Sequence, residues 1–334
     1  MKKSVLLIRL SSLGDVLLTT GVIRELSEQF PDVSIDVLTS TKFTEVFTNS
    51  PYIRNCFPID TTQSAVRMAV QRNTILKYAQ EGKPYDFIID LQNSLRSRLF
   101  TFGLSKNIAR MKKYRLEKIA MVQKKEKLTL PLIPDRYRNT IQTFFQIQND
   151  NKGLDYFNST YTSSNNENYI GIAPGAKHFT KRLPIKIWKK VIELLNNQGF
   201  TVVLFGGKED VSVCEGLSDD KNNKILNRSG ATSLVETSEY LQQCAVVVSN
   251  DSSVGHLAAS FKIPVVSIFG STIPGFGFVP YQTQNIIVEN TSASCRPCTH
   301  IGKSECPLGH FDCMNLLSPE TIVESVLKLL TKNT

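Results

Sequence analysis

Runs of apolar residues alternate with amphipathic stretches along the first half of the chain. Residues 4–10 are almost continuously apolar, which is typical of a strand buried in a parallel sheet. From Leu18 to Phe30 an apolar residue recurs at every fourth position, a spacing that predicts an amphipathic helix. The same succession predicts strands at 34–38, 55–58 and 85–91 and helices at 41–48 and 65–80. Strands that alternate with helices favour a parallel sheet covered by helices on both faces.

A polar tract divides this pattern from a second one of the same kind. Residues 158–166 are mainly Asn, Ser and Thr, a composition typical of a linker. Beyond it we expect strands at 169–173, 201–205, 245–249 and 264–269 and helices at 184–199, 236–244 and 319–330. The chain therefore divides into a Rossmann-like domain (1–150), a linker (151–168), a second Rossmann-like domain (169–317) and a terminal helix (318–334). In open sheets of this kind, ligands bind beyond the carboxyl ends of the strands.

The composition points to the cytoplasm. No stretch approaches the roughly 18 consecutive apolar residues of a membrane span. Arg9 interrupts the first apolar run and no small-residue cleavage site follows it, so we expect no signal peptide. In that compartment the seven cysteines should be mostly reduced.

The net charge of +9 is concentrated in one segment. Residues 96–127 contain eleven basic and two acidic residues, so the rest of the chain is neutral. Such a segment is either a solvated basic surface or the binding surface for an anionic partner: a nucleic acid, an anionic membrane or a phosphorylated substrate. Aromatic residues are sparse there, which favours phosphate binding over base stacking and argues against a nucleic-acid partner.

The first strand is followed by Ser11-Ser12-Leu13-Gly14-Asp15, a strand-to-helix turn of small and polar residues. The start of a helix presents free backbone N–H groups and a positive dipole end, which suit an anion or a sugar hydroxyl. Asp15 would stand at the mouth of this turn. The alternative is that Asp15 only caps the helix, since carboxylates favour the first helical turn.

Several strand ends in the second half carry groups that suit a nucleotide. They are Pro174-Gly175 with Thr180-Lys181-Arg182, Gly206-Gly207-Lys208-Glu209-Asp210, the tract from Asn250 to His256, and Gly270-Ser271-Thr272. A lysine binds phosphate as a point charge, hydroxyls and helix N-termini add donors, and a carboxylate accepts from ribose hydroxyls. Neither the GxGxxG nor the P-loop pattern occurs, which argues against an NAD dehydrogenase and a P-loop NTPase.

These motifs, in this order and spacing, resemble glycosyltransferase family 9, the ADP-heptose:lipopolysaccharide heptosyltransferases. The resemblance runs from residue 1 to about residue 330 and rests on six tracts: 11–15, 90–98, 174–175, 181–184, 205–207 and 250–256. It implies an α/β fold of the GT-B type, with an acceptor domain first, a nucleotide-sugar domain second, the two facing across a cleft, and a terminal helix that can cross back. It also implies inverting, metal-independent transfer of a heptose from ADP-heptose to the inner core of lipopolysaccharide. The enzyme would then be cytoplasmic and peripheral on the inner face of the bacterial inner membrane.

The resemblance also implies roles for individual residues. Asp15 corresponds to the family's general base. The expected donor site consists of Gly14, Gly175, Thr180, Lys181, Glu209, Asp251, Ser252, Ser253 and His256. The expected acceptor contacts are Ser12, Gln92, Asn93, Arg96 and Arg98. Glu209 is the nearest match to an acidic ribose ligand, with the register open by one or two positions. Ser253 departs from the family's usual glycine, which leaves the identity of the donor sugar open.

Four cysteines lie close together in the sequence. Cys295, Cys298, Cys306 and Cys313 have a spacing at which four thiolates can bind zinc, and two histidines lie among them. The alternatives are reduced cysteines in a loop, or disulfides. The transfer reaction itself needs no cofactor, so such a zinc ion would be structural.

Three alternatives to the heptosyltransferase stay open at this point. The enzyme can use another nucleotide-sugar, or it can be a sugar-nucleotide epimerase of GT-B shape. An epimerase needs paired acid and base groups, and only Asp15 is evident on the acceptor side. The third alternative is a basic, non-enzymatic binding protein. The sequence does not indicate an oligomeric state.

Overall fold

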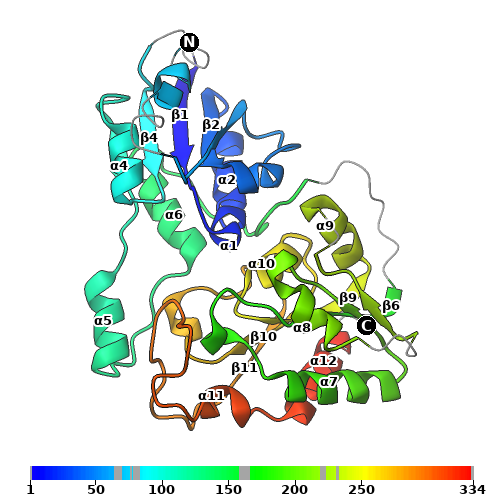
Figure 1. Ribbon diagram of the computed structural model, residues 1–334. Helices are drawn as coiled ribbons and strands as arrows, with labels where there is room; N and C mark the ends of the chain where they lie inside the picture. Colours follow the sequence, from blue (N-terminus) through cyan, green and yellow to red (C-terminus); the bar gives the residue numbers. More distant parts are fainter. Residues whose placement is uncertain are drawn as a thin grey trace. The chain divides into compact units, whose positions relative to one another are not determined.

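The computed structural model describes residues 2–63, 70–75, 77, 83–157, 166–218, 223–230 and 233–331. The chain forms two compact units, drawn in Figure 1. The first unit comprises Met1–Lys113 and Ile133–Ser159, and the second comprises Tyr114–Leu132 and Thr160–Thr334.

The first unit contains a parallel five-stranded sheet with β1 at its centre. The strand order is β3-β2-β1-β4-β5, with β1 Lys3–Ile8, β2 Val33–Ser40, β3 Asn55–Ile59, β4 Phe87–Asp90 and β5 Ile108–Arg110. Its helices are α1 Leu13–Leu17, α2 Thr20–Gln29, α4 Leu95–Thr101 and α6 Ile133–Ile141, with a 3-10 helix, η1, at Thr41–Val46. Because β1 has neighbours on both sides and helices above and below, its side chains from Val5 to Ile8 are fully buried. The helix expected at 65–80 lies partly outside the described residues.

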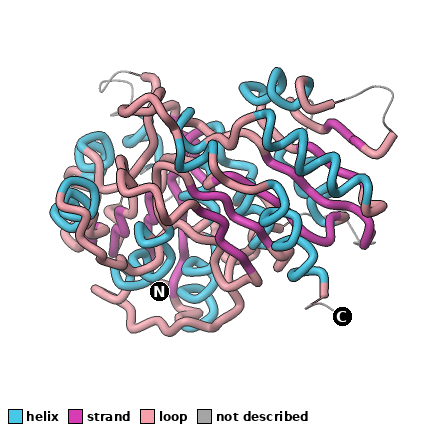
Figure 2. Tube along the Cα trace, turned by 90° about the horizontal axis from the view of Figure 1, so that it is seen from below, coloured by secondary structure: helices cyan, strands magenta, loops and turns pink. Residues whose placement is uncertain are grey.

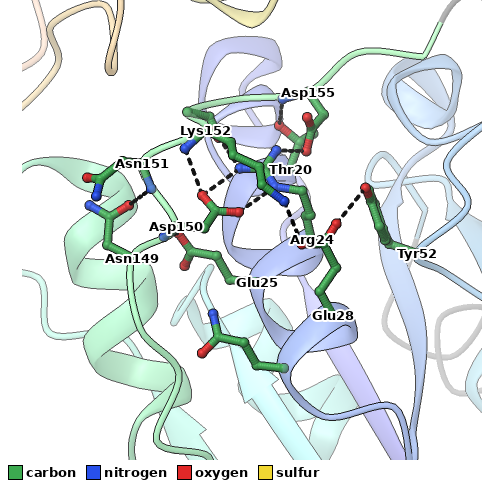
Figure 3. Close-up of polar contacts among 12 residues, drawn as sticks. Thr20, Arg24, Glu25, Glu28, Tyr52, Asn149, Asp150, Asn151, Lys152 and Asp155 are labelled. Atoms are coloured by element: carbon green, nitrogen blue, oxygen red, sulfur yellow. Dashed lines mark hydrogen bonds and ion pairs between the residues drawn. The ribbon is translucent and has the colours of Figure 1, made fainter.

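Residues 149–155 are fastened to α2 by ion pairs and hydrogen bonds (Figure 3). The Arg24 guanidinium pairs with Asp150 at 2.7 Å and with Asp155, and donates to the Gly153 carbonyl at 2.9 Å. Gly21 permits this approach, since a Cβ there would lie 2.3 Å from the Gly153 oxygen. The chain up to Asp155 is therefore part of the first unit, and most of the polar tract at 158–166 lies outside the described residues.

The second unit contains a parallel six-stranded sheet in the order β11-β10-β9-β6-β7-β8. Its strands are β6 Asn166–Ala173, β7 Thr201–Leu204, β8 Ile225–Asn227, β9 Cys244–Asn250, β10 Val265–Phe269 and β11 Asn285–Glu289. Its helices are α5 Arg115–Gln123, α7 Ile185–Asn197, α8 Val211–Glu215, α9 Leu234–Gln242, α10 Ser253–Ser260, α11 Asp312–Asn315 and α12 Pro319–Leu330, with 3-10 helices η2 Phe179–Lys181, η3 Lys208–Asp210 and η4 Pro274–Phe276. Figure 2 shows strands running side by side with helices along them.

The terminal helix α12 has the bounds expected from the sequence, and it packs within the second unit. Its apolar face, including Val323 and Val326, shares a core with Trp188 and Leu195 of α7 and with the strands of the second sheet. The expected return of the helix to the first unit stays a prediction. Within the described ranges, no helix is both long enough and apolar enough to cross a membrane.

The basic segment is divided between the two units, which differs from the expected continuous domain at 1–150. Residues 114–132, including α5, belong to the second unit because Met121 and Leu130 pack in a small core with Phe276. The Leu130 amide donates to the Gly275 carbonyl, and the Lys125 ammonium donates to the Cys295 and Pro297 carbonyls at 2.8 and 2.7 Å. A small apolar cluster and a few hydrogen bonds hold residues 114–132 in the second unit, and such a short pattern does not stand out in the sequence.

Candidate functional site

The turn from β1 into α1 positions Asp15. Ser12 is the N-cap of α1, and its backbone N–H and hydroxyl both donate to Asp15 Oδ2, at 3.0 and 2.9 Å. The carboxylate therefore caps the helix, as the alternative interpretation of the sequence expected. Its side chain is nevertheless 16% exposed, and its other oxygen, Oδ1, pairs with the Arg9 guanidinium at 2.7 Å. This arrangement allows Asp15 both to cap the helix and to contact a substrate.

Arg9 is held rigidly at the end of β1. Its guanidinium donates to the Leu91 carbonyl at 2.7 Å and lies 5.7 Å from the centre of the Tyr137 ring. Burial lowers the pKa of Arg9, but the charge and hydrogen bond of Asp15, together with Tyr137 and Asp90, outweigh this, so the pKa lies above its usual value. Arg9 is thus a permanent cation beside Asp15, a contact that the sequence analysis did not anticipate because Arg9 lies within an apolar run.

The end of β4 is organised by a buried carboxylate. Asp90 accepts hydrogen bonds from the Gln92 and Asn93 amides and from the Ser97 hydroxyl. Burial raises the pKa of Asp90, and these hydrogen bonds oppose the rise. The Gln92 side chain in turn accepts from the backbone N–H groups of Leu10 and Ser11, at 3.1 and 3.3 Å. Gln92 thus ties the Asp15 turn to the end of the neighbouring strand.

The remaining expected acceptor contacts surround the start of α4. The Asn93 amide donates to the Met111 carbonyl, and its oxygen accepts from Arg98 Nε at 3.0 Å. Arg96 and Arg98 are exposed. Asn93 is therefore a structural link, whereas the two arginines present charge to the solvent.

In the second unit, Lys181 forms an ion pair beyond the ends of β9 and β10. Its ammonium lies 2.6 Å from Asp251 Oδ2, which also accepts from the Thr272 hydroxyl at 2.8 Å. The Asp251 side chain is 8% exposed and that of Lys181 is 16% exposed. The carboxylate is thus the better buried partner, and it orients the ammonium.

The turn between β9 and α10 lines a shallow cavity. Asn250 joins the strand ends, since its amide donates to the Pro174 carbonyl at 2.7 Å and its oxygen accepts from the Leu183 amide. The cavity is lined by Asn250, Asp251, Ser252, Gly255, His256, Ser267, Phe269, Phe278 and Pro280. Ser252 is the N-cap of α10, which begins at Ser253. Three expected donor residues, Asp251, Ser252 and His256, therefore meet at one cavity.

Thr180 has a different environment from the other expected donor residues. It is buried, and its hydroxyl accepts from the Lys303 amide at 2.8 Å and from the Ser271 hydroxyl at 2.9 Å. These contacts join η2 to the loops that follow β10 and β11. They favour a structural role for Thr180, and contact with a donor stays a prediction.

The acidic residue that faces the ends of β6 and β7 is Asp210, next to the expected Glu209. A Cβ on Gly175 or Gly206 would lie 2.2 or 2.6 Å from the Asp210 side chain, so the two glycines make room for it. Its carboxylate accepts from the Gly207 amide at 3.1 Å. Burial raises the pKa of Asp210, an effect that this hydrogen bond opposes. Glu209 is exposed, and its contact with a ribose stays a prediction.

Comparison with known families identifies the chain. The family described as glycosyltransferase family 9 (heptosyltransferase) matches residues 75–308. The chain belongs to this family. The expected family and enzyme class, a glycosyltransferase, are confirmed.

Curated members of family 9 align along nearly the whole chain. Lipooligosaccharide heptosyltransferase 2 of Haemophilus ducreyi is 25% identical over 353 residues, which cover 98% of this chain and 99% of that protein. Lipopolysaccharide heptosyltransferase 2 of Escherichia coli K12 is 24% identical, over 81% of this chain and 84% of that protein.

Solved structures of family 9 have the same fold. A family 9 glycosyltransferase from Veillonella parvula superposes with a TM-score of 0.80 at 19% identity, covering 99% of this chain and 98% of that one. The E. coli ADP-heptose lipopolysaccharide heptosyltransferase II gives a TM-score of 0.73 at 19% identity, over 100% and 99% of the two chains. Together with the two parallel sheets, these likenesses confirm the GT-B fold class.

The four cysteines of the predicted zinc site lie in the second unit as free thiols. Burial raises the pKa of Cys313 to about 12 and that of Cys298 above its usual value, and the neighbouring sulfurs add to both shifts. Among the described residues, which include all four, no three His, Cys, Asp or Glu side chains are arranged to hold a metal ion. Structural zinc stays a prediction.

Proposed function

We propose that this family 9 enzyme transfers a heptose from ADP-heptose to the inner core of lipopolysaccharide, with inversion at the anomeric carbon. The observation that carries the proposal is the alignment with lipooligosaccharide and lipopolysaccharide heptosyltransferases 2 over up to 98% of the chain. The reaction needs an acceptor lipid that resides in a membrane, so the enzyme would work at the cytoplasmic face of the inner membrane.

Asp15 is assigned the general base. The acceptor oxygen forms a bond to the anomeric carbon, its proton passes to the Asp15 carboxylate, and the electron pair of the broken C–O bond leaves with the ADP diphosphate. An ionised carboxylate has about four lone-pair positions. Arg9 and the two Ser12 donors account for three, which leaves room on Oδ1 for the acceptor hydroxyl.

Arg9 is assigned the role of a positioning residue for this base. The buried guanidinium lies 2.7 Å from Oδ1 and holds the carboxylate in one orientation. The hydrogen bond to the Leu91 carbonyl fixes the guanidinium, and hence Oδ1, in one place.

Lys181 is assigned to the leaving diphosphate. Its ammonium, oriented by Asp251, supplies positive charge where negative charge develops, and the first amides of α10 add hydrogen-bond donors. The proposal therefore routes no step through a metal ion. Ser252, Ser253, His256 and Gly175 are assigned to the donor, and Arg96 and Arg98 to acidic groups of the acceptor.

Incubation of the purified enzyme with ADP-heptose and truncated lipopolysaccharide acceptors tests the proposal. Acceptors without heptose and with one heptose are compared, and a gain of one heptose is read by mass spectrometry together with release of ADP. NMR of the product gives the anomeric configuration, which is inverted if the proposal holds. An isomerised donor with no mass gain on any acceptor would identify an epimerase instead, and transfer from a different nucleotide-sugar alone would correct the donor.

The acceptor assignment has a separate test. Arg96→Ala should raise the KM for a phosphorylated acceptor and leave the KM for ADP-heptose unchanged, and added salt should weaken acceptor binding. An acceptor KM that responds to neither change contradicts the assignment.

A further inference from the structure

Helix α4 and the residue that ends it expose three large apolar side chains. Leu95, Leu99 and Phe102 are 76%, 57% and 77% exposed. Leu95 and Leu99 lie one turn apart on α4, and Phe102 follows as its C-cap with a φ of −59°, so the three side chains form a stripe. Contiguous exposed apolar surface of this kind marks an interaction site more often than isolated apolar residues do.

The fold of the first unit does not use this stripe. The opposite side of α4 carries the contacts that hold it: the Ser97 hydroxyl donates to Asp90 at 2.9 Å, and Phe100 is buried in the core with Ile88. Ser94 caps the helix by accepting from the Ser97 amide. Hydrogen bonds and apolar packing on its inner side thus hold α4 in place, while Leu95 and Leu99 face solvent.

Basic side chains lie on the same helix as the stripe. Arg96 and Arg98 are exposed there, and Lys106 is exposed in the segment that follows. An apolar stripe flanked by arginine and lysine is complementary to a bilayer with anionic headgroups, because the apolar groups enter the interface and the cations meet phosphates.

The helix α5 repeats this composition in the second unit. Leu116 and Ile119 are 79% and 47% exposed and lie three positions apart, while Met121 is turned into the protein. Arg115 and Lys124, at its two ends, are exposed. The two helices thus carry the same combination, and both lie in the segment that holds the net charge of the chain.

We propose that α4 and α5 bind the surface of an anionic lipid bilayer, with Leu95, Leu99 and Phe102 of α4 and Leu116 and Ile119 of α5 entering the interface. The nearby arginines and lysines contact the lipid phosphates. This surface includes Arg96 and Arg98, which are also assigned to acidic groups of the acceptor, and in that respect it rests on the proposed function. The five apolar side chains are assigned to no substrate.

Co-sedimentation with vesicles that contain no lipopolysaccharide tests the proposal. The wild-type protein should bind vesicles of phosphatidylcholine with added phosphatidylglycerol, and bind phosphatidylcholine alone much more weakly. Salt should weaken the binding, because the cations contact headgroups within a Debye length of about 10 Å at 0.1 M.

Two variants and a matched control separate the stripes from general surface hydrophobicity. L95N/L99N/F102N and L116N/I119N should each lower the partition coefficient for anionic vesicles by about tenfold or more, since transfer of several apolar side chains into the interface is lost. The control L308N/L316N removes two leucines that are equally exposed and lie outside the basic segment. It should bind as the wild type does. Thermal unfolding of each variant shows whether it is folded.

Equal binding of the wild type to neutral and anionic vesicles, or of folded stripe variants and the control, overturns the proposal. Turnover of a deacylated, water-soluble acceptor distinguishes this failure from failure of the proposed function. The stripe variants should keep that turnover, because none of the five side chains is assigned to substrate. Loss of turnover in folded stripe variants would place these side chains in the acceptor site and overturn their assignment to the bilayer.

Discussion

Each unit pairs a carboxylate with a cation beyond the ends of its strands. The two ion pairs differ in which partner is the better buried one. In Arg9–Asp15 the arginine is the better buried partner, with 10% of its side chain exposed against 16% for the aspartate. In Lys181–Asp251 the aspartate is the better buried partner, with 8% against 16% for the lysine. In both pairs the more exposed partner is the one that we assign to substrate.

The comparison indicates how an ion pair can leave one partner available to a substrate while the fold holds the other partner in place. The inner partner is fixed by further contacts, Arg9 by the Leu91 carbonyl and Asp251 by the Thr272 hydroxyl. The outer partner is thereby oriented, and it retains access to solvent. A pair such as Arg138–Glu25, buried at both ends, has no such outer partner.

The largest effect is expected at Asp15. Asp15→Asn keeps the shape and removes the proton acceptor, so kcat should fall by roughly 10²–10⁴-fold. Single-turnover kinetics with saturating donor and acceptor measure the fall. Ser12→Ala is the control, because it removes one hydrogen bond to Oδ2 and leaves the carboxylate, and it should cost less than tenfold. An Asn variant with full turnover would refute the assignment of the base.

The next effect is expected at Lys181. Lys181→Met removes the cation while keeping the length of the side chain, and kcat should fall by about 10²–10³-fold because charge on the leaving diphosphate is no longer stabilised. ADP binding, measured by calorimetry, should weaken as well.

Thr272→Val is the matched control for this change. It removes another contact of Asp251 while the ammonium stays in place. If Thr272→Val lowers kcat as much as Lys181→Met does, the Lys181–Asp251 pair acts by holding the loop in shape. The proposal that Lys181 contacts the substrate and Asp251 only orients it is then wrong.

A third variant tests the contrast with an ion pair in which both side chains are buried. Glu25→Ala removes the better buried of the two carboxylates that pair with the Arg138 guanidinium and leaves Asp135 in place, so the free energy of unfolding should fall by about 3 kcal/mol. Denaturant titration measures this loss. Turnover per folded molecule should not change, and a large fall in kcat at full folding would place this pair in the site as well.

The sequence predicted the long, strongly patterned elements well and the short ones poorly. The bounds expected for β1 and α12 are within two residues of those observed, because an unbroken apolar run and a capped amphipathic helix are strong local signals. The edge strands β5, β8 and β11 were not expected, whereas β3, an edge strand of five residues, was predicted at 55–58. The three-residue strands β5 and β8 carry too little alternation to be recognised.

The candidate site residues were predictable where a motif directly follows a strand. They were not predictable where a contact joins residues that only the fold brings together. The tracts around Asp15 and Asp251 were found because small and polar residues follow buried strands. The Arg9–Asp15 pair was not, because it depends on a buried arginine directly after β1, within a run of apolar residues. The choice between Glu209 and Asp210 also depends on the fold, since Gly175 and Gly206 come from different strand ends.

The smallest effect on turnover is expected from metal removal. The transfer proposed above uses Asp15 and Lys181 and routes no charge through a metal, so a chelator should leave kcat within about twofold. Metal analysis of protein purified without added zinc tests the cysteine cluster separately: one zinc per chain, lost in Cys298→Ser, would establish a structural site. A chelator that abolishes turnover while Lys181→Met has little effect would transfer the stabilising charge from the lysine to a metal. That result would leave the Arg9–Asp15 pair as the only one of the two built to present a reacting group.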